Sequence, residues 1–291
     1  MTDAGRQSSF LVGLIGSTIQ ASLTPAMHER EADENGLRYI YRLIDIEKLG
    51  LGVKALPELL TAAERVGFAG VNVTHPCKQT VIPLLHELSD VARALGAVNT
   101  VVLSNGRRIG HNTDWWGFAE SFRRGLPDVK RERVVQLGAG GAGAAVAHAA
   151  LTLGIAQLMI VDTDQARAEQ VAASLSERFG IGRAAAPRDL AAAVGAADGV
   201  INATPMGMAK YPGLPMPAEL LRRELWVADI VYFPLETEFL RRARMLGCRT
   251  LDGGGMAVFQ AAEAFRLFTG VTPDAERMRR HFTAMTNGSP I

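Results

Sequence analysis

The chain has 291 residues, of which 48% are hydrophobic and 21% are charged, and its formal net charge at pH 7 is +1. This composition is typical of a soluble globular protein with room for two cores, and the lack of a basic tract argues against nucleic acid or an anionic membrane as the main partner. Two cysteines, Cys77 and Cys248, are too few for a disulfide framework, and Cys and His lack the spacing of a zinc site, so we expect no metal.

Two segments bear on the cellular compartment and on whether the chain spans a membrane. The N-terminal residues Met1 to Gln7 lack the apolar region of a secretory signal, so we expect a protein of the reducing cytoplasm. The run from Val134 to Val161 carries no charge and is long enough to cross a bilayer. Glycines and polar residues interrupt it, and a buried strand, helix and strand explain all its parts, so we expect no membrane span.

Alternating patterns in the first part of the chain predict an α/β domain. Apolar runs predict strands at 10–15, 39–44, 70–74 and 97–103, with helical patterns between them. Thr24 before Pro25 predicts a helix that Thr24 caps, and Thr74-His75-Pro76 predicts a second helix that starts in the same way.

The residues from Arg133 to Gly143 predict a dinucleotide-binding turn. They form a short apolar run, glycines spaced G-x-G-x-x-G, and the start of an alanine-rich helical stretch. The glycines permit a tight turn, close approach of phosphates and close packing of helix on strand, while the helix N-terminus attracts the anion. An acid should follow about twenty residues later to hold the ribose hydroxyls, and Asp162 stands there. The predicted loop residues are Gly138, Ala139, Gly140, Gly141 and Ala142.

The second half of the chain therefore reads as a Rossmann domain. Strands are predicted at 158–161, 199–202, 225–231 and 248–251, a helix at 115–124 leads into the domain, and helices follow at 257–268 and after Thr272. About 130 residues precede the glycine loop, which is enough for a substrate domain. We expect an α/β fold with an N-terminal α/β substrate domain at 1–114, a doubly wound parallel-sheet NAD domain at 115–256, and a cleft between them.

Lys78 and Asp114 are the candidate proton-transfer groups. Lys78 falls in the first turn of the helix that Pro76 opens, where the helix dipole disfavours a cation, and Asp114 falls where the connecting helix starts. If the two meet, they form a dyad at the cleft, in which the ammonium holds and protonates a substrate oxygen. A surface lysine and an aspartate that only caps a helix are the common alternatives.

Ser22 and Thr24 lie immediately ahead of the first helix. Two hydroxyls and free N–H groups there would suit a carboxylate, although Thr24 could equally be a simple N-cap. Nothing poises His28 for catalysis, so a solvated or capping histidine is expected. Cys77 has no evident catalytic partner and is expected to be a small buried apolar residue.

Together these segments resemble the shikimate dehydrogenase family, including its quinate/shikimate dehydrogenase branch, over nearly the whole chain. The motifs that carry the resemblance are Ser22-Leu23-Thr24-Pro25, Asn72-Val73-Thr74-His75-Pro76-Cys77-Lys78, Gly96-Ala97-Val98-Asn99-Thr100, Asn112-Thr113-Asp114, Gly138 to Gly143, Asn202-Ala203-Thr204-Pro205-Met206-Gly207, Asp229-Ile230-Val231-Tyr232 with Pro234, and Asp252-Gly253-Gly254-Gly255-Met256 with Gln260-Ala261. The resemblance implies that helices at about 257–291 complete the N-terminal domain.

The resemblance also implies an activity and a set of roles. The expected reaction is reversible hydride transfer between NAD and a ring secondary alcohol of shikimate, giving 3-dehydroshikimate, with quinate and 3-dehydroquinate as a second pair, within aromatic amino acid biosynthesis. Lys78 and Asp114 would be catalytic. The substrate, a polyhydroxy cyclohexene or cyclohexane carboxylate, would contact Ser22, Thr24, Thr74, Asn99, Tyr232 and Gln260. Besides the glycine loop and Asp162, the cofactor would contact Arg167, Thr204, Ile230, Gly253 and Met256. The chain would act as a monomer or homodimer.

One departure from the family pattern bears on the cofactor. Biosynthetic members commonly have Asn-Arg-Thr after the second Rossmann strand, where the arginine and threonine hold the 2′-phosphate of NADP, whereas this chain has Asp162, Thr163 and Asp164. Two carboxylates would repel a phosphate, while Asp162 can accept both ribose hydroxyls. NAD is therefore expected to bind more favourably than NADP, by on the order of a few kcal/mol. Arg167 remains at the family's second basic position, which leaves residual NADP use open.

Two alternatives remain. A related dehydrogenase could act on an aminated shikimate analogue, which the sequence does not exclude. A non-catalytic NAD-sensing regulator could keep the fold without the reaction, but its expected mark is a missing Lys or Asp at the cleft, and both Lys78 and Asp114 are present.

Overall fold

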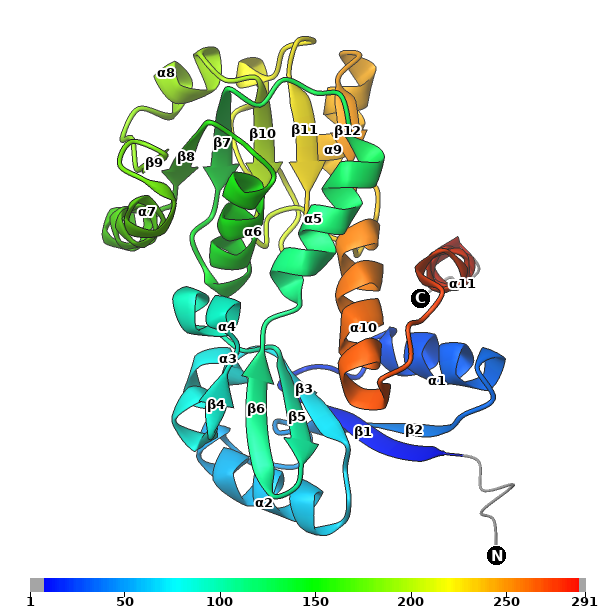
Figure 1. The fold of residues 1–291 in the computed structure, drawn as a ribbon. Helices are drawn as coiled ribbons and strands as arrows, with labels where there is room; N and C mark the ends of the chain where they lie inside the picture. The colour runs from blue at the N-terminus through cyan, green and yellow to red at the C-terminus, as the bar shows by residue number, and fades with distance from the viewer. Residues whose placement is uncertain (1–7, 288–291) are drawn as a thin grey trace, which may run out of the picture. The chain divides into compact units, whose positions relative to one another are not determined.

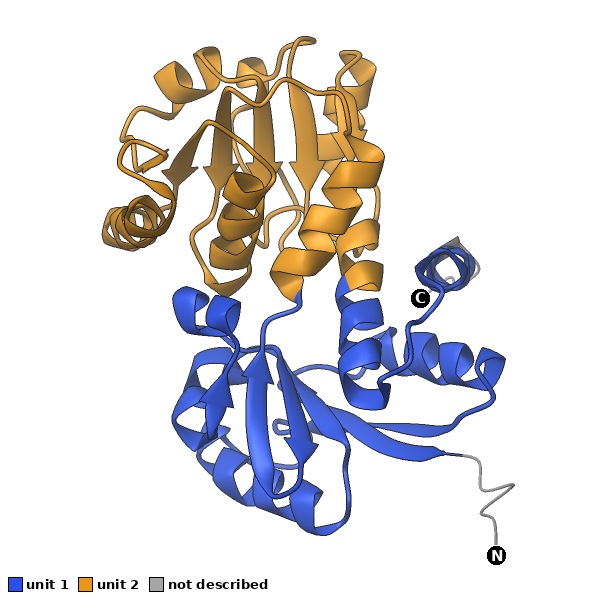
Figure 2. Ribbon diagram, viewed as in Figure 1, with its two compact units in different colours: residues 1–113, 260–291 blue, residues 114–259 orange. Residues whose placement is uncertain are grey.

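The computed structural model describes residues 8–287. The chain divides into two compact units, one of residues 1–113 with 260–291 and one of residues 114–259 (Figure 2). The boundaries read from the sequence, after residues 114 and 256, lie close to these. The first seven and the last four residues of the expected substrate domain, together with the segment in which no secretory signal was found, lie outside the described residues.

The first unit is built on a six-stranded mixed sheet with strand order β2-β1-β3-β5-β6-β4 (Figure 1). Its strands are β1 (Ser9–Gly16), β2 (Arg38–Asp45), β3 (Gly70–Val73), β4 (Glu87–Leu88), β5 (Thr100–Ser104) and β6 (Arg107–His111). Its helices are α1 (Thr24–Glu34), α2 (Leu56–Arg65), α3 (Cys77–Thr80), α4 (Asp90–Leu95), the larger part of α10 (Gly254–Thr269) and α11 (Ala275–Asn287).

The strand directions place several chain ends at one edge of this sheet. β1, β2 and β3 are parallel, β5 is antiparallel to β3, and β6 is antiparallel to β5. The ends of β1, β3 and β6 and the start of β5 therefore share an edge. The sequence did not reveal β4, which has two residues, or β6, which begins with two arginines, because neither shows an apolar run. The strand expected from residue 97 begins at Thr100.

Both faces of this sheet are covered. On one face Ile15, Val71 and Val73 pack with Leu56 and Leu60 of α2. On the other face Val12 and Leu14 pack in a cluster with Phe268 of α10, so the C-terminal segment completes the core of the first unit.

His28 is buried among aromatic rings, contrary to the expected solvated or capping role. Its side chain is 0% exposed, and Tyr41 and Phe265 lie edge-on to the imidazole. Nδ1 lies 2.9 Å from the hydroxyl of Tyr39. Burial lowers the pKa of His28 to about 3, so the ring is neutral at physiological pH. The apolar neighbours come partly from α10, which the local sequence could not reveal.

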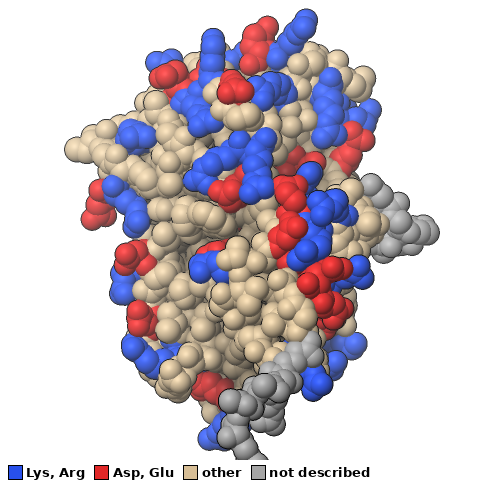
Figure 3. Space-filling view, turned by 45° about the vertical axis from the view of Figure 1, so that its right-hand side comes forward, with Lys and Arg blue, Asp and Glu red and all other residues tan. Residues whose placement is uncertain are grey.

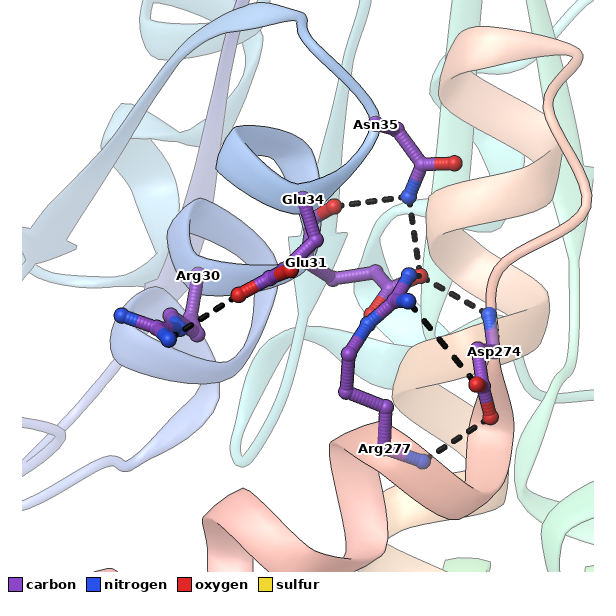
Figure 4. Close-up of polar contacts among 6 residues, drawn as sticks. All are labelled: Arg30, Glu31, Glu34, Asn35, Asp274 and Arg277. Atoms are coloured by element: carbon purple, nitrogen blue, oxygen red, sulfur yellow. Dashed lines mark hydrogen bonds and ion pairs between the residues drawn. The ribbon is translucent and has the colours of Figure 1, made fainter.

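A buried carboxylate joins α1 to α11 (Figure 4). Glu31 is 1% exposed, and it accepts hydrogen bonds from Arg277 Nε at 2.9 Å and Nη2 at 2.6 Å. The backbone N–H of Asp274, at 2.8 Å, and Nδ2 of Asn35, at 2.9 Å, also donate to Glu31. This carboxylate thus receives a bidentate arginine contact and two further donors, the arrangement that a buried charge requires.

The second unit contains a six-stranded sheet of order β12-β11-β10-β7-β8-β9 in which every pairing is parallel. Its strands are β7 (Arg133–Leu137), β8 (Gln157–Val161), β9 (Ala184–Ala185), β10 (Gly199–Asn202), β11 (Trp226–Asp229) and β12 (Arg249–Leu251). Its helices are α5 (Asp114–Gly125), α6 (Gly141–Thr152), α7 (Gln165–Phe179), α8 (Leu190–Gly195), α9 (Glu238–Met245) and the start of α10.

Helices cover both faces of the parallel sheet. Val134 packs in a cluster with residues of α5, α6 and α7, and its neighbour Val135 packs in a cluster with residues of α8 and α9. The predicted doubly wound, Rossmann-type fold is confirmed. The strand order reverses between β7 and β10, and the crevice at the carboxyl ends beside such a reversal is where this fold binds ligands.

Three expectations from the sequence concern a membrane span, the distribution of charge and a metal site. The uncharged run from Val134 to Val161 is β7, α6 and β8, and no helix in the described part of the chain could span a membrane. Basic and acidic side chains are interspersed over the face in Figure 3. Among residues 8–287, no three His, Cys, Asp or Glu side chains cluster in a way that could hold a metal ion.

We expect Glu31→Gln to lower the free energy of unfolding by about 3 kcal/mol, because the amide keeps the shape but removes the buried charge that receives the two hydrogen bonds of Arg277. The control is Glu87→Gln, which breaks an exposed pair with Arg107 and should cost less than about 1 kcal/mol. Urea denaturation at pH 7 measures both. Equal losses of unfolding free energy in the two variants would show that the buried contact of Glu31 stabilises the fold no more than the exposed ion pair of Glu87.

Candidate functional sites in the two units

Three segments with predicted substrate and catalytic residues meet at one edge of the first sheet. The N–H of Ser17, after β1, donates to the carbonyl oxygen of His75, after β3, at 3.0 Å. The N–H of Val98, before β5, donates to the carbonyl oxygen of Lys78 at 2.9 Å. The backbone therefore brings the segments of Thr74, Lys78 and Asn99 together, as their positions at strand ends require.

Lys78 lies in α3, a single turn of four residues. A helix begins directly after Thr74-His75-Pro76, as predicted, but the predicted cap was wrong, because Pro76 occupies the N-cap position and no side chain caps the turn. A one-turn helix has a small dipole, so the dipole argument for Lys78 carries little weight. The neighbouring Cys77 is buried, as expected, and burial raises the pKa of its thiol.

Thr24 is the first residue of α1, and its predicted capping role was wrong. The N-cap position belongs to Leu23, with no side-chain cap. The hydroxyl of Ser22 accepts the N–H of Thr24 at 3.3 Å. Within residues 8–287, the Thr24 hydroxyl makes no hydrogen bond to the protein. Two hydroxyls and the first N–H groups of α1 thus remain suited to an anionic ligand group.

Asp45 braces the loop that leads to Ser22, a role that the sequence reading missed. Its carboxylate, at the end of β2, accepts hydrogen bonds from the N–H groups of Thr18 at 3.3 Å and Ile19 at 3.2 Å, and from Nε2 of Gln20 at 3.1 Å. Loss of water opposes ionisation, but the hydrogen bonds outweigh it and lower the pKa of Asp45. Thr18 adopts φ of 56°, an uncommon conformation that this acceptor helps to hold.

Asn99 fixes the chain immediately before Asp114. Its Oδ1 accepts the N–H of Thr113 at 2.7 Å, and its Nδ2 donates to the Thr113 hydroxyl at 2.9 Å. Asn112, which precedes Thr113, donates from Nδ2 to the carbonyl oxygen of Ala97 at 3.0 Å. These contacts hold the end of β6, where the chain leaves the first unit.

In the second unit, Asp114 begins α5 and is 7% exposed. Loss of water around the Tyr232 phenol and the nearby Asp114 carboxylate both raise the pKa of Tyr232. This unit therefore brings together one residue predicted to be catalytic and one predicted to bind substrate. Gln260, another predicted substrate residue, lies in α10 where the chain re-enters the first unit.

The glycine loop between β7 and α6 has the shape of a phosphate cradle. Gly138 has φ of 98°, and a Cβ on Gly143 would lie 2.4 Å from the carbonyl oxygen of Gly138, so both positions require glycine. A Cβ on Gly140 or Gly141 would instead enter open space. The first N–H groups of α6 have no acceptor within the helix. The residues present therefore fit a dinucleotide pyrophosphate.

Gln136, in the strand that precedes this loop, holds the loop in place. The sequence did not reveal this role because the residue lies within a run that was read as apolar. The side chain is fully buried in β7. Its Nε2 donates to the carbonyl oxygens of Gly138 and Gly143, each at 2.8 Å. One amide thus holds the first and third glycines of the motif in place.

Asp162 follows β8 and faces the same loop. It accepts the N–H of Ala139 at 2.7 Å and the N–H of Asp164 at 2.9 Å. Burial opposes ionisation, but these hydrogen bonds and the charge of Arg167 lower the pKa of Asp162, so it is a carboxylate at neutral pH. Asp164 caps α7 by accepting the N–H of Arg167, and its carboxylate lies 3.2 Å from the guanidinium of Arg167.

The remaining predicted cofactor residues follow β10, β11 and β12. The N–H of Thr204 donates to Oδ1 of Asn202, and a Cβ on Gly253 would lie 2.4 Å from the carbonyl oxygen of Ile230. The structure therefore places Ile230 and Gly253 side by side. Met256 is 8% exposed and belongs to the core cluster of the second unit.

Family models match most of the chain. The model described as the shikimate dehydrogenase substrate binding domain matches residues 14–101, and the one described as the shikimate 5′-dehydrogenase C-terminal domain matches residues 253–281. A model described as the alanine dehydrogenase/PNT C-terminal domain matches residues 122–224. The two models described as shikimate dehydrogenase domains together match parts of both units.

Individual relatives match over nearly their whole length. A Streptomyces avermitilis protein named shikimate dehydrogenase (NADP(+)) is 63% identical, covering 94% of each chain. A Corynebacterium efficiens protein named quinate/shikimate dehydrogenase (NAD(+)) is 51% identical, covering 95% of this chain and 99% of the other. The solved structure of a Corynebacterium glutamicum quinate dehydrogenase in complex with NAD is 47% identical, with a TM-score of 0.91 over 96% of this chain and 100% of that one.

We expect Asp45→Asn to accelerate amide hydrogen exchange at Thr18 and Ile19 by about tenfold, because their N–H groups lose a charged acceptor. Hydrogen exchange with mass spectrometry at pH 7 measures this. Exchange in β5 and β6 should not change and serves as the internal control. Unchanged exchange at Thr18 and Ile19 would show that Asp45 does not hold the loop.

Proposed function

The chain belongs to the shikimate dehydrogenase family, and from that premise we propose that it is an NAD-dependent dehydrogenase of shikimate, with quinate as a second substrate. Its relatives support the broader statement that it is a nicotinamide-dependent oxidoreductase of shikimate-like acids. The preference for NAD and the roles of single residues rest on this chain's own side chains.

One observation carries the substrate assignment: the segments of Thr74, Lys78 and Asn99 meet at the edge of the first sheet to which the loop after β1 also leads. We assign the hydroxyls of Ser22 and Thr24, with the N-terminus of α1, to the substrate carboxylate. Four predicted polar side chains then remain for the ring hydroxyls. They are Thr74, Asn99, Tyr232 and Gln260.

Lys78 and Asp114 are the proposed catalytic residues, one from each unit. In the oxidative direction they hold the hydroxyl on the reacting ring carbon, which loses its proton to this pair as the carbon gives up a hydride. In reduction the Lys78 ammonium donates a proton to the carbonyl oxygen. The nicotinamide, when bound, supplies the hydride acceptor or donor. Asn99 supports Asp114 by fixing the preceding residue, Thr113.

The cofactor proposal follows from Asp162 and Asp164. Relatives carry both cofactor names, with NADP(+) at 63% identity and NAD(+) at 51% identity. In this chain the Asp162 carboxylate stands at the glycine loop, where it can accept ribose hydroxyls and would repel a 2′-phosphate. Arg167, the residue that could offset this repulsion, is paired with Asp164. We therefore propose NAD as the preferred cofactor, with some NADP use through Arg167.

The other cofactor contacts are proposed from the positions of the residues in the second unit. Gly138 to Ala142 are proposed to hold the pyrophosphate, and Thr204, Ile230 and Gly253 to lie on the nicotinamide side. Met256 is packed in the core, so we propose that it supports this side through packing.

We expect Lys78→Ala to lower kcat for shikimate oxidation by about 100-fold or more while NADH affinity changes little, because the variant loses the proton-transfer group. Initial rates and NADH fluorescence titration measure the two quantities.

The matched control is Lys54→Ala, which removes an exposed lysine from the same unit. Near-normal turnover in Lys78→Ala would remove Lys78 from the mechanism. A wild-type protein that binds NADH but oxidises neither shikimate nor quinate would instead favour the regulator alternative.

We expect wild-type kcat/KM to be about tenfold or more higher with NAD than with NADP, and Asp162→Ala to lower the NAD value by about 10- to 100-fold with a much smaller effect on NADP. The reason is the loss of a charged acceptor for the ribose hydroxyls. Asp189→Ala removes the cap of α8 in the same unit and should leave the cofactor ratio unchanged. Equal losses with both cofactors would contradict the assignment.

A further inference from the structure

A buried carboxylate at the end of β11 connects several segments of the second unit. Asp229 is 2% exposed. Its Oδ1 accepts Nδ2 of Asn202 at 2.9 Å and the N–H of Val231 at 3.0 Å, and its Oδ2 accepts the hydroxyl of Thr237 at 2.8 Å. In the described part of the chain, every hydrogen bond that this carboxylate accepts thus comes from a neutral donor.

These contacts close the loop between β11 and α9 at both ends. Val231 is near the start of the loop, and Thr237 at its end is the N-cap residue of α9, whose hydroxyl also accepts the N–H of Leu240. Ile230 and Tyr232 lie within the closed segment. A single carboxylate therefore fixes where this segment leaves the sheet and where it enters the helix.

Asn202 extends the connection to the neighbouring loop. Its Oδ1 accepts the N–H of Thr204 at 3.0 Å and the Thr204 hydroxyl at 2.7 Å. Its Nδ2 donates to the carbonyl oxygen of Met206 at 3.0 Å as well as to Asp229. Both amide hydrogens are committed, so the contact defines one orientation of the side chain.

We propose that Asp229, together with Asn202, is a positioning residue that holds Ile230, Tyr232 and Thr204 in the geometry required for cofactor and substrate binding. This inference rests on the proposed function, because those three residues owe their roles to it. Asp229 acts through the two loops and touches neither the cofactor nor the substrate.

The protonation of Asp229 gives the proposal a measurable signature. Burial raises the pKa of Asp229 to about 6, the nearby carboxylate of Asp252 adds to this rise, and the hydrogen bonds from Val231, Thr237 and Asn202 oppose it. The carboxylate is the better acceptor for these donors. As the pH falls through about 6, protonation of Asp229 turns an acceptor oxygen into a donor and so alters these contacts. By linkage, the raised pKa means that an opening of the segment that hydrates Asp229 becomes easier as the pH rises through about 6.

The test compares wild type with Asp229→Asn from pH 5 to pH 8. The variant resembles the protonated residue, so we expect kcat/KM for shikimate at pH 8 to fall about tenfold, and the wild-type inflection near pH 6 to disappear. Amide exchange in the segment 230–237, corrected for the intrinsic pH dependence of exchange, should rise in wild type as the pH increases through about 6 and should lack this dependence in the variant.

Two further variants separate positioning from general stability. Thr237→Val removes one donor to Asp229 and should loosen the segment 230–237, whereas Thr237→Ser retains the hydroxyl and should restore wild-type exchange and kinetics. Asp198→Asn alters a carboxylate of the same unit that accepts the N–H groups of Glu132 and Arg133. It is the control for loss of stability and should leave the pH profile unchanged.

The outcomes distinguish this inference from the proposed function. If wild type oxidises shikimate but Asp229→Asn keeps the wild-type pH profile and segment exchange, the positioning role is overturned. If wild type turns over neither shikimate nor quinate, the proposed function fails. The role of Asp229 in holding the loops is then decided by exchange in the Asp229 and Thr237 variants.

Discussion

In a parallel sheet, the carboxyl ends of neighbouring strands lie at the same edge, and almost every residue with a proposed role depends on this constraint. Thr74 follows β3, Asp162 follows β8, and Ile230 follows β11. In the first sheet, the antiparallel β5 adds Asn99 from its amino end. Within each sheet, residues that lie far apart in the sequence thus come together because the hydrogen-bonded strands end at the same edge.

Three carboxylates fix the loops at these edges, and in the described part of the chain no lysine or arginine side chain hydrogen-bonds to them. Asp45, Asp162 and Asp229 each accept backbone N–H groups of a loop, and each terminates or directly follows a strand. The hydrogen bonds lower the pKa of Asp45 and Asp162, whereas deep burial raises that of Asp229. The same contact therefore gives a permanent charge at two loops and a titratable one at the third.

The sequence was informative where a function depends on neighbours in the chain. The glycine loop, the position of Asp162 and the start of α5 at Asp114 are local patterns, and the structure has all three. It was misleading about the Thr24 cap, and it did not reveal the buried aromatic neighbours of His28. Gln136, Asp45 and Asp229 were missed as bracing residues because their roles depend on contacts that a single sequence does not display.

The order of segments along the chain has a consequence for biosynthesis. The second unit is inserted between two parts of the first, since residues 114–259 separate them. Phe268 and Arg277, which pack against β1 and bind Glu31, belong to the later part. A nascent chain emerging from the ribosome can complete the second unit while the first still lacks these partners. The unit that begins first is therefore the one that must finish folding last.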